Sequence, residues 1–269
     1  MTGLLYALRA FFGVGIREAF SYPLMMLDRV INLSAVTILL FYGGRLLSPE
    51  NTTVALPADY FLYGMTGYAV IQVFNAGLVG FRFRVRQFQL HGLLEACVMT
   101  RTKLWQILLT APAYEFVTSL ARSAMLFGLA LLVARQTVPI GGTLKALAVL
   151  ALGTSSFLCL GFISACGVLV LKRGEPLTRG ISLATMLFSG AFFPRELLPD
   201  WLAAGAGWLP VAPTVDAMRI LLFEAPAGMD LRTAVMRLAI TTVGLLPFVF
   251  LAYRYSARAV LIDGSLSHY

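Results

Sequence analysis

The sequence contains few groups of residues that could carry out a chemical reaction. It lacks the G-x-x-x-x-G-K-[ST] loop that cradles nucleotide phosphates, and residues 141–145 place two glycines and a lysine in the wrong order for one. Neither the H-E-x-x-H pattern of metalloproteases nor the G-x-S-x-G turn of hydrolases occurs. The only histidines, His91 and His268, lie far apart in the chain. The sequence therefore predicts no catalytic site, no metal site and no cofactor in this chain.

A stripe of aromatic and amide side chains follows one apolar segment, residues 60–81. Its members recur at helical spacing and are Tyr60, Tyr68, Gln72 and Asn75. Aromatic faces stack on sugars and amides hydrogen-bond to hydroxyl groups, so the stripe suits the path of an oligosaccharide or amphiphile. Ordinary packing and hydrogen bonding between helices would account for the same residues. The sequence leaves both interpretations open.

Two charged residues, Glu115 and Arg122, lie within a second apolar segment, residues 112–134. Charge inside a bilayer is costly, and a spacing of seven puts both side chains on one helical face. We expect them to pair across a polar neighbour or to reach the inner interface. Cysteine spacing gives no metal or disulfide framework.

The composition indicates which medium surrounds most of the protein surface. Of the 269 residues, 59% are hydrophobic and 13% are charged, whereas soluble domains carry about 25% charged residues. Lipid must therefore be the main solvent. The net charge of +8 is typical of a membrane protein with lysine and arginine in its cytoplasmic loops, and nucleic acid is not expected as a partner.

Apolar segments of the length that a bilayer requires, about 20 residues, recur along the chain. The six candidate spans are residues 24–44, 60–81, 112–134, 147–171, 180–193 and 238–253. Residues 1–22 alternate apolar and polar positions at helical spacing, which predicts an amphipathic helix in the membrane interface. The segments on the same side of the membrane as the N-terminus contain more basic residues than the segments on the other side. Both termini are therefore expected in the cytoplasm.

Two further segments interrupt the apolar pattern. Residues 82–103 mix arginines with phenylalanine and leucine, which is typical of a short amphipathic helix on the cytoplasmic face. Such a helix docks into a groove on a partner or lies on anionic lipid. Residues 194–229 are apolar but contain several prolines, so they form short re-entrant helices in place of one span.

Three stretches of sequence point to one protein family. Residues 187–201 (LFSGAFFPRELLPDW), then 209–210 (LP) and 216–219 (DAMR), match the pattern S-G-x-x-[FY]-P-x-x-x-L-P followed by D-A-x-R. Residues 92–95 (GLLE) are similar to a G-T-L-E motif, with leucine in place of threonine, and residues 172–176 (KRGEP) match a loop of the same proteins. In these stretches the chain resembles the ABC-2 type permeases, which are the membrane subunits of ATP-driven exporters.

The resemblance implies an all-α membrane protein that is a single permease domain over residues 1–269. It has six transmembrane helices, the interface helix, a coupling helix and re-entrant helices before the last span. Two permease copies and two ATPase subunits, which hold ATP and Mg, form such an exporter. The expected setting is a bacterial inner membrane, and the expected substrate is a lipid-linked oligosaccharide, a polysaccharide or another amphiphile. A multidrug exporter is the alternative, and an ion-coupled transporter is disfavoured because no internal repeat is evident.

Two further sets of site residues follow from the resemblance. The residues expected to couple to the ATPase are Arg82, Arg84, Arg86, Gln87, Glu95 and Arg101. The residues expected to form an outer gate are Pro194, Pro199, Trp201 and Pro210.

Overall fold

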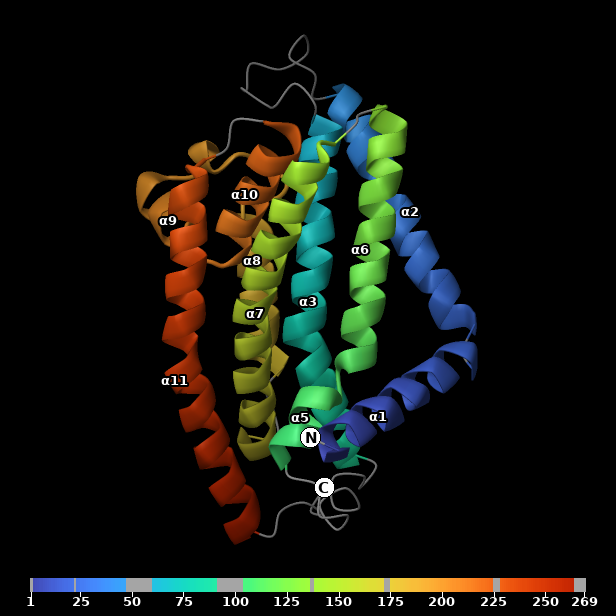
Figure 1. Ribbon diagram of the computed structural model, residues 1–269, viewed down its shortest axis with the longest axis vertical. Helices are drawn as coiled ribbons and strands as arrows, with labels where there is room; N and C mark the ends of the chain where they lie inside the picture. The colour runs from blue at the N-terminus through green and yellow to red at the C-terminus, as the bar shows by residue number, and fades with distance from the viewer. Residues whose placement is uncertain are drawn as a thin grey trace.

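The computed structural model of the chain consists of helices joined by turns and short loops in the part that it describes (Figure 1), namely residues 2–21, 23–46, 60–90, 104–135, 138–171, 175–224 and 228–263. The helices are α1 (Thr2–Ser21), α2 (Pro23–Leu46), α3 (Tyr60–Leu90), α5 (Leu104–Thr110), α6 (Ala113–Ala134), α7 (Ile140–Leu171), α8 (Glu175–Phe188), the 3-10 helix η1 (Arg195–Leu197), α9 (Asp200–Ala206), α10 (Val211–Phe223) and α11 (Leu231–Asp263). The all-α class expected from the sequence is confirmed for these residues.

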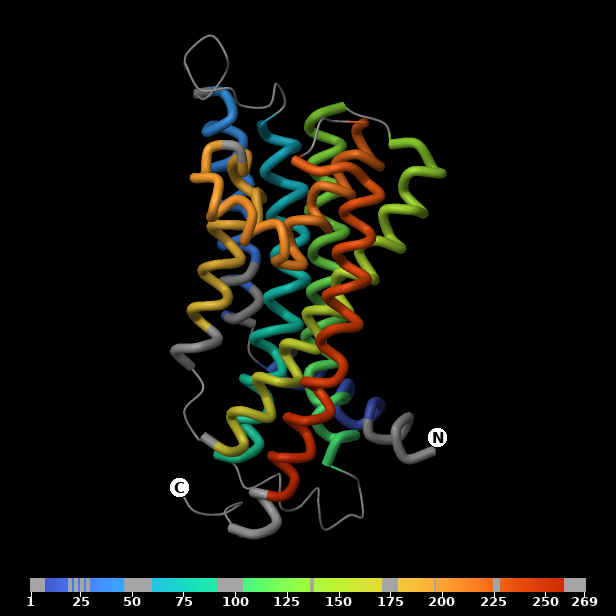
Figure 2. Tube along the Cα trace, turned by 90° about the vertical axis from the view of Figure 1, so that its left-hand side faces the viewer, coloured from blue at the N-terminus to red at the C-terminus, as the bar shows by residue number. Residues whose placement is uncertain are grey.

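Helix α3 runs through the centre of the bundle and packs against α2, α6, α7, α8 and α10. Helix α1 crosses one end of the bundle obliquely, and the short helices α9 and α10 lie at the other end (Figure 1). We refer to these as the α1 end and the α10 end. Helix α8 stands on the opposite side of α3 from the first turns of α7 (Figure 2).

Three helical stretches in the described residues are long and apolar enough to cross a membrane. They are Leu104–Ala134, Ile140–Val170 and Leu231–Arg258. The apolar parts of α2 and α8 are shorter, Val30–Arg45 and Arg179–Phe188. Helix α3 has 31 residues and is long enough. The amides and arginines along it lower its mean hydropathy, so it does not belong to this group.

Helix α3 extends beyond the second expected span. Helix α3 does not stop at Phe81 but continues to Leu90. The reason is that Phe81, Val85 and Phe88 recur at helical spacing and are buried in a cluster with Ile107 of α5. Residues 82–90 of the expected coupling region are therefore the last turns of a long helix.

Three other expected boundaries are corrected in the same way. Helix α7 begins at Ile140, directly after Pro139, and not at residue 147. Helix α8 spans Glu175–Phe188, because Gly190 takes a positive φ that ends the helix before residue 193. Helix α11 spans Leu231–Asp263, well beyond residues 238–253. A helix can continue through charged residues beyond its apolar segment. Hydropathy alone does not predict these polar ends.

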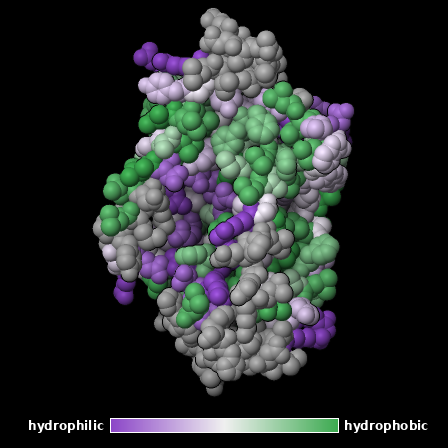
Figure 3. Space-filling model, turned by 180° about the vertical axis from the view of Figure 1, so that it is seen from behind, coloured by the Kyte–Doolittle hydropathy of each residue, from purple (hydrophilic) through white to green (hydrophobic). Residues whose placement is uncertain are grey.

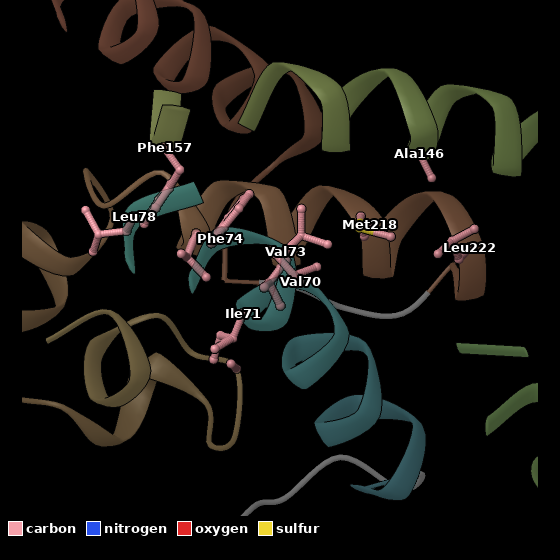
Figure 4. Close-up of a cluster of buried hydrophobic side chains, with 12 residues drawn as sticks. Val70, Ile71, Val73, Phe74, Leu78, Ala146, Phe157, Met218 and Leu222 are labelled. Carbon is pink, nitrogen blue, oxygen red and sulfur yellow. The ribbon is translucent and has the colours of Figure 1, made fainter. Parts of the chain in front are cut away.

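The core between α3, α7 and α10 consists of large apolar side chains packed around a close helix crossing (Figure 4). The rings of Phe74 and Phe157 stack with their centroids 4.4 Å apart. A methyl group at Gly161 of α7 would overlap the carbonyl oxygen of Gly77 on α3. Small residues at this crossing let the two backbones touch.

Gly161→Ala is expected to lower the melting temperature of the purified protein. The added methyl meets backbone, so α3 and α7 must move apart, and overpacking of this kind costs about 1–3 kcal/mol. Gly167→Ala on the same helix is the control, because nothing lies within 4 Å of a methyl group there. Both variants gain the same helix propensity, so a thermal melt compares packing alone. Equal melting temperatures for the two variants would contradict the close crossing.

Candidate functional site

Helix α3 has one buried face and one open face. Met65, Val73 and Leu78 are completely buried. The open face carries the partly exposed polar residues Gln72, Asn75, Arg82, Arg86 and Gln87. The first four of these lie on one stripe, since their spacings are all close to whole helical turns. A helix in the middle of a bundle thus exposes amides and guanidinium groups along one side.

One side of the molecule is hollowed. Seen from the side that carries α2 and α8, the molecule has a central depression lined by hydrophilic residues and bordered by hydrophobic ones (Figure 3). Helices α2 and α8 both pack against α3 and flank it.

Tyr68 lies at the α10 end of the stripe. Its hydroxyl accepts a hydrogen bond from Gln72 Nε2 at 3.0 Å, and its ring centroid is 6.4 Å from that of Phe192, which follows α8. The Arg122 side chain of α6 acts electrostatically on Tyr68. Tyr60 and Tyr68 both pack against the apolar cluster that α2, α3 and α6 share.

The three prolines expected at an outer gate each start a short helix. Pro194, Pro199 and Pro210 are the residues directly before η1, α9 and α10. Proline suits these positions because its fixed φ favours the start of a helix and its missing N–H is not needed there. Trp201 lies on α9 with 76% of its surface exposed, and a tryptophan so placed is typical of a membrane interface.

The turn between α8 and η1 requires the Ser-Gly pair of the sequence motif. Gly190 has a φ of +72°, a conformation that a side chain disfavours. Ser189 Oγ accepts a hydrogen bond from the Ala191 N–H at 3.2 Å. A methyl group on Gly67 of α3 would overlap the carbonyl of Ala191. The turn is therefore pressed against α3.

A buried ionic cluster holds this turn to α10. Arg195 forms a salt bridge with Asp216, and both side chains are almost fully buried. Arg219, which is 2% exposed, donates hydrogen bonds of 2.9 Å to the carbonyl oxygens of Gly190, Ala191 and Tyr63. Two cations and one carboxylate thus share the cluster, and the three carbonyl oxygens compensate the second cation.

Tyr63 of α3 completes the cluster. Its hydroxyl donates to the Gly190 carbonyl at 2.9 Å, and the Arg219 guanidinium carbon lies 3.2 Å from its ring centroid. A cation over an aromatic face gains about 2 kcal/mol or more when it is desolvated. The sequence marks Arg195, Asp216 and Arg219 only as parts of a motif, and it predicts neither their pairing nor the role of Tyr63. Buried charges in an apolar segment are the signal that would have found them.

A second ionic cluster lies at the α1 end. Arg84 Nη1 is 2.7 Å from Glu18 Oε2 of α1, and Arg84 Nη2 is 3.6 Å from Glu115 Oε1 of α6. Phe11 of α1 stacks on Phe88 of α3 with centroids 5.3 Å apart. Helix α1 is thereby fixed to α3 and α6.

The site residues predicted from the sequence lie in different parts of the structure. Glu115 Oε1 lies 3.6 Å from Arg84 Nη2, and Arg122 of α6 acts electrostatically on Tyr68. The expected pair of Glu115 with Arg122 stays a prediction. Arg82, Arg86 and Gln87 lie on the open face of α3. Glu95 and Arg101 lie outside the described residues. No group of His, Cys, Asp or Glu side chains that could hold a metal ion occurs within the described ranges.

A helical bundle with a polar hollow, and with short helices locked by buried charges at one end, defines a membrane transport protein. The family model described as ABC-2 type transporter matches residues 8–223, and the chain belongs to this family. The membrane domains of this family lack ATPase activity and pair with separate ATPase subunits. No curated protein matches the chain.

Proposed function

We propose that this chain is the permease of an exporter that moves an amphipathic substrate, such as a lipid-linked oligosaccharide or a polysaccharide, out of the cytoplasm. The observation that carries the proposal is the polar stripe on the open face of α3, a helix that α2 and α8 flank. Amides and aromatic rings at membrane depth offer hydrogen bonds and stacking to a glycan. A purely hydrophobic drug would gain nothing from them.

The proposed topology assigns six spans to α2, α3, α5 with α6, α7, α8 and α11. Helix α1 lies in the interface, and both termini lie on the cytoplasmic side of a bacterial inner membrane. The α10 end then faces outward, and residues 194–229 close the path there. The basic residues on the α1 end of α3 support this orientation.

The proposed assembly contains two permease copies and two ATPase subunits. The hollow is open on the side of α2 and α8, and a polar path within a bilayer needs shelter from lipid. A second copy on that side would supply it. The mass of the purified active complex and the stimulation of its ATPase by candidate lipids and glycans test the proposal. A lone permease chain with full transport activity would refute it.

Glu95→Gln is expected to lower transport and substrate-stimulated ATPase activity while the permease still inserts and dimerises. A carboxylate in a cytoplasmic coupling segment gains nothing from anionic lipid, but it can pair with a basic residue of the ATPase. Loss of one partner from a desolvated charge pair costs about 2–5 kcal/mol, so a pull-down of the ATPase detects it. Arg9→Gln, an exposed change on α1, is the control. Wild-type ATPase binding by the Glu95 variant would rule out the contact.

A further inference from the structure

Gly207 directly follows α9 and marks a place where two arginine side chains converge. Its φ of −63° and ψ of −12° are ordinary helical values, so the backbone does not require a glycine at this position. The Nη1 atoms of Arg195 and Arg237 both lie within 4 Å of the point that a Cβ on Gly207 would occupy. The absence of a side chain therefore makes room for two guanidinium groups.

The carboxylate beside these two groups does not balance them. Asp216 pairs with Arg195 and also acts electrostatically on Arg219. Arg237 donates a hydrogen bond of 3.3 Å to the Gly207 carbonyl oxygen, and no carboxylate of the described residues forms a salt bridge with it. A guanidinium has five N–H donors, so Arg237 keeps donors for a further acceptor.

The surroundings of Arg237 are those of a membrane interface. Its guanidinium carbon lies 5.4 Å from the ring centroid of Trp208, and Trp208 and Trp201 are 51% and 76% exposed. Exposed tryptophans at the end of a membrane bundle are typical of the headgroup level. Arg237 lies only about 9 Å along the helix axis from Leu231, where α11 begins.

An apolar surface continues from Arg237 along α11 towards the α1 end. Met236, Ile240 and Val243 are each more than half exposed. Ile240 comes three residues after Arg237 and so lies next to it on the helix surface. Acyl chains pack well on such a surface, whereas a free phosphate ion gains nothing from it.

We infer that an anionic phospholipid binds between α9 and α11, in the leaflet at the α10 end. Its phosphate is bound by Arg237, since guanidinium groups bind phosphate oxygens through paired N–H donors. The buried Arg195, on the other side of Gly207, adds a second positive charge. The ring of Trp208 flanks the headgroup, and the acyl chains follow Ile240. This site is separate from the path of the exported substrate, and it does not depend on the direction of transport.

The alternative is an arginine that only extends into the water beyond the membrane. The hydrogen bond to Gly207 and the ring of Trp208 hold the Arg237 guanidinium on the protein surface instead, beside Arg195. Two like charges that meet at the edge of a low-dielectric medium repel each other. A bound phosphate removes this repulsion and joins α9 to α11.

Native mass spectrometry of the purified permease with its ATPase tests the inference. The probes are phosphatidylglycerol and phosphatidylcholine with identical acyl chains, which differ in net headgroup charge. We expect the wild type to bind phosphatidylglycerol with about fivefold higher affinity. Arg237→Gln is expected to lose one tightly bound phosphatidylglycerol per permease chain, and Arg237→Lys is expected to keep it with lower affinity.

Gly207→Ala tests the geometry without a change of charge. The added methyl group meets the mobile end of the Arg237 side chain and not backbone, so the variant should fold normally and lose the same lipid. It decides the question if Arg237→Gln does not fold. Arg232→Gln, an exposed change on the first turn of α11, is the matched control and should keep the lipid.

Three results would overturn the inference. The first is an equal number of bound phosphatidylglycerol molecules in the wild type and in Arg237→Gln. The second is loss of the same lipid in Arg232→Gln, which would indicate general surface charge. The third is displacement of the lipid by glycerol phosphate at an equal concentration, which would show a site for a soluble anion.

Discussion

Arg219→Met is expected to abolish transport and to reduce the amount of folded protein. The side chain makes three charge-assisted hydrogen bonds to carbonyl groups on α3 and on the turn after α8. Methionine fills a similar volume but donates to none of these carbonyls, of which only that of Gly190 keeps a side-chain donor in the cluster, the Tyr63 hydroxyl, and it leaves Asp216 with Arg195 as its remaining cationic partner in the cluster. Because α10, α3 and the turn meet at this one guanidinium, its loss weakens the contact among all three.

The size of the effect follows from burial. Removing one member of a buried ionic network costs about 3–5 kcal/mol, which is a large fraction of the about 5–15 kcal/mol that stabilises a typical folded protein. The decrease should appear as a lower melting temperature in detergent and as lower transport per molecule of assembled complex.

Two variants make the interpretation specific. Arg219→Lys keeps the charge but cannot reach three carbonyls at once, so we expect intermediate stability and poor transport. Arg232→Met changes an exposed arginine of α11 and should leave both measurements unchanged. Wild-type transport by Arg219→Lys would show that the cluster only fills space.

The sequence was informative about local structure wherever the helical period decided the answer. The helix over residues 2–21, the start of α3 at Tyr60 and the short helices in place of one span over residues 194–229 follow from helical spacing, from hydropathy and from the chemistry of proline. Hydropathy did not predict where the helices end. Phe81, Val85 and Phe88 continue α3 into a polar stretch, and an apolar window stops where the arginines begin.

The partners of charged residues could not be predicted from the sequence. A spacing of seven places Glu115 and Arg122 on one helical face, but it gives no sign that Arg84 of another helix lies 3.6 Å from Glu115. The same holds for Arg195 and Asp216, which are joined only because η1 folds back on α10. A motif can mark such residues, but only the packing of helices that are distant in sequence determines which ones pair.

Arg84→Met is expected to uncouple the permease from its ATPase. Arg84 fixes α1 and α6 to the last turns of α3, directly before the segment that holds Glu95. Without it, Glu115 loses its cation in a site where its side chain is only 22% exposed. The pair with Glu18 contributes little, about 0–1 kcal/mol, because that carboxylate is half exposed and solvent screens it.

We therefore expect a loss near the lower end of the about 3–5 kcal/mol that breaking a buried pair costs, together with a several-fold lower substrate-stimulated ATPase rate. The double variant Arg84→Met/Glu115→Gln removes both charges and should recover much of the stability, because no uncompensated carboxylate remains. It should not recover the ATPase rate, since the ion pairs that join α1 and α6 to the last turns of α3 stay broken. A double variant that restores stability and coupling together would show that Arg84 acts on the fold alone and does not transmit the ATPase signal.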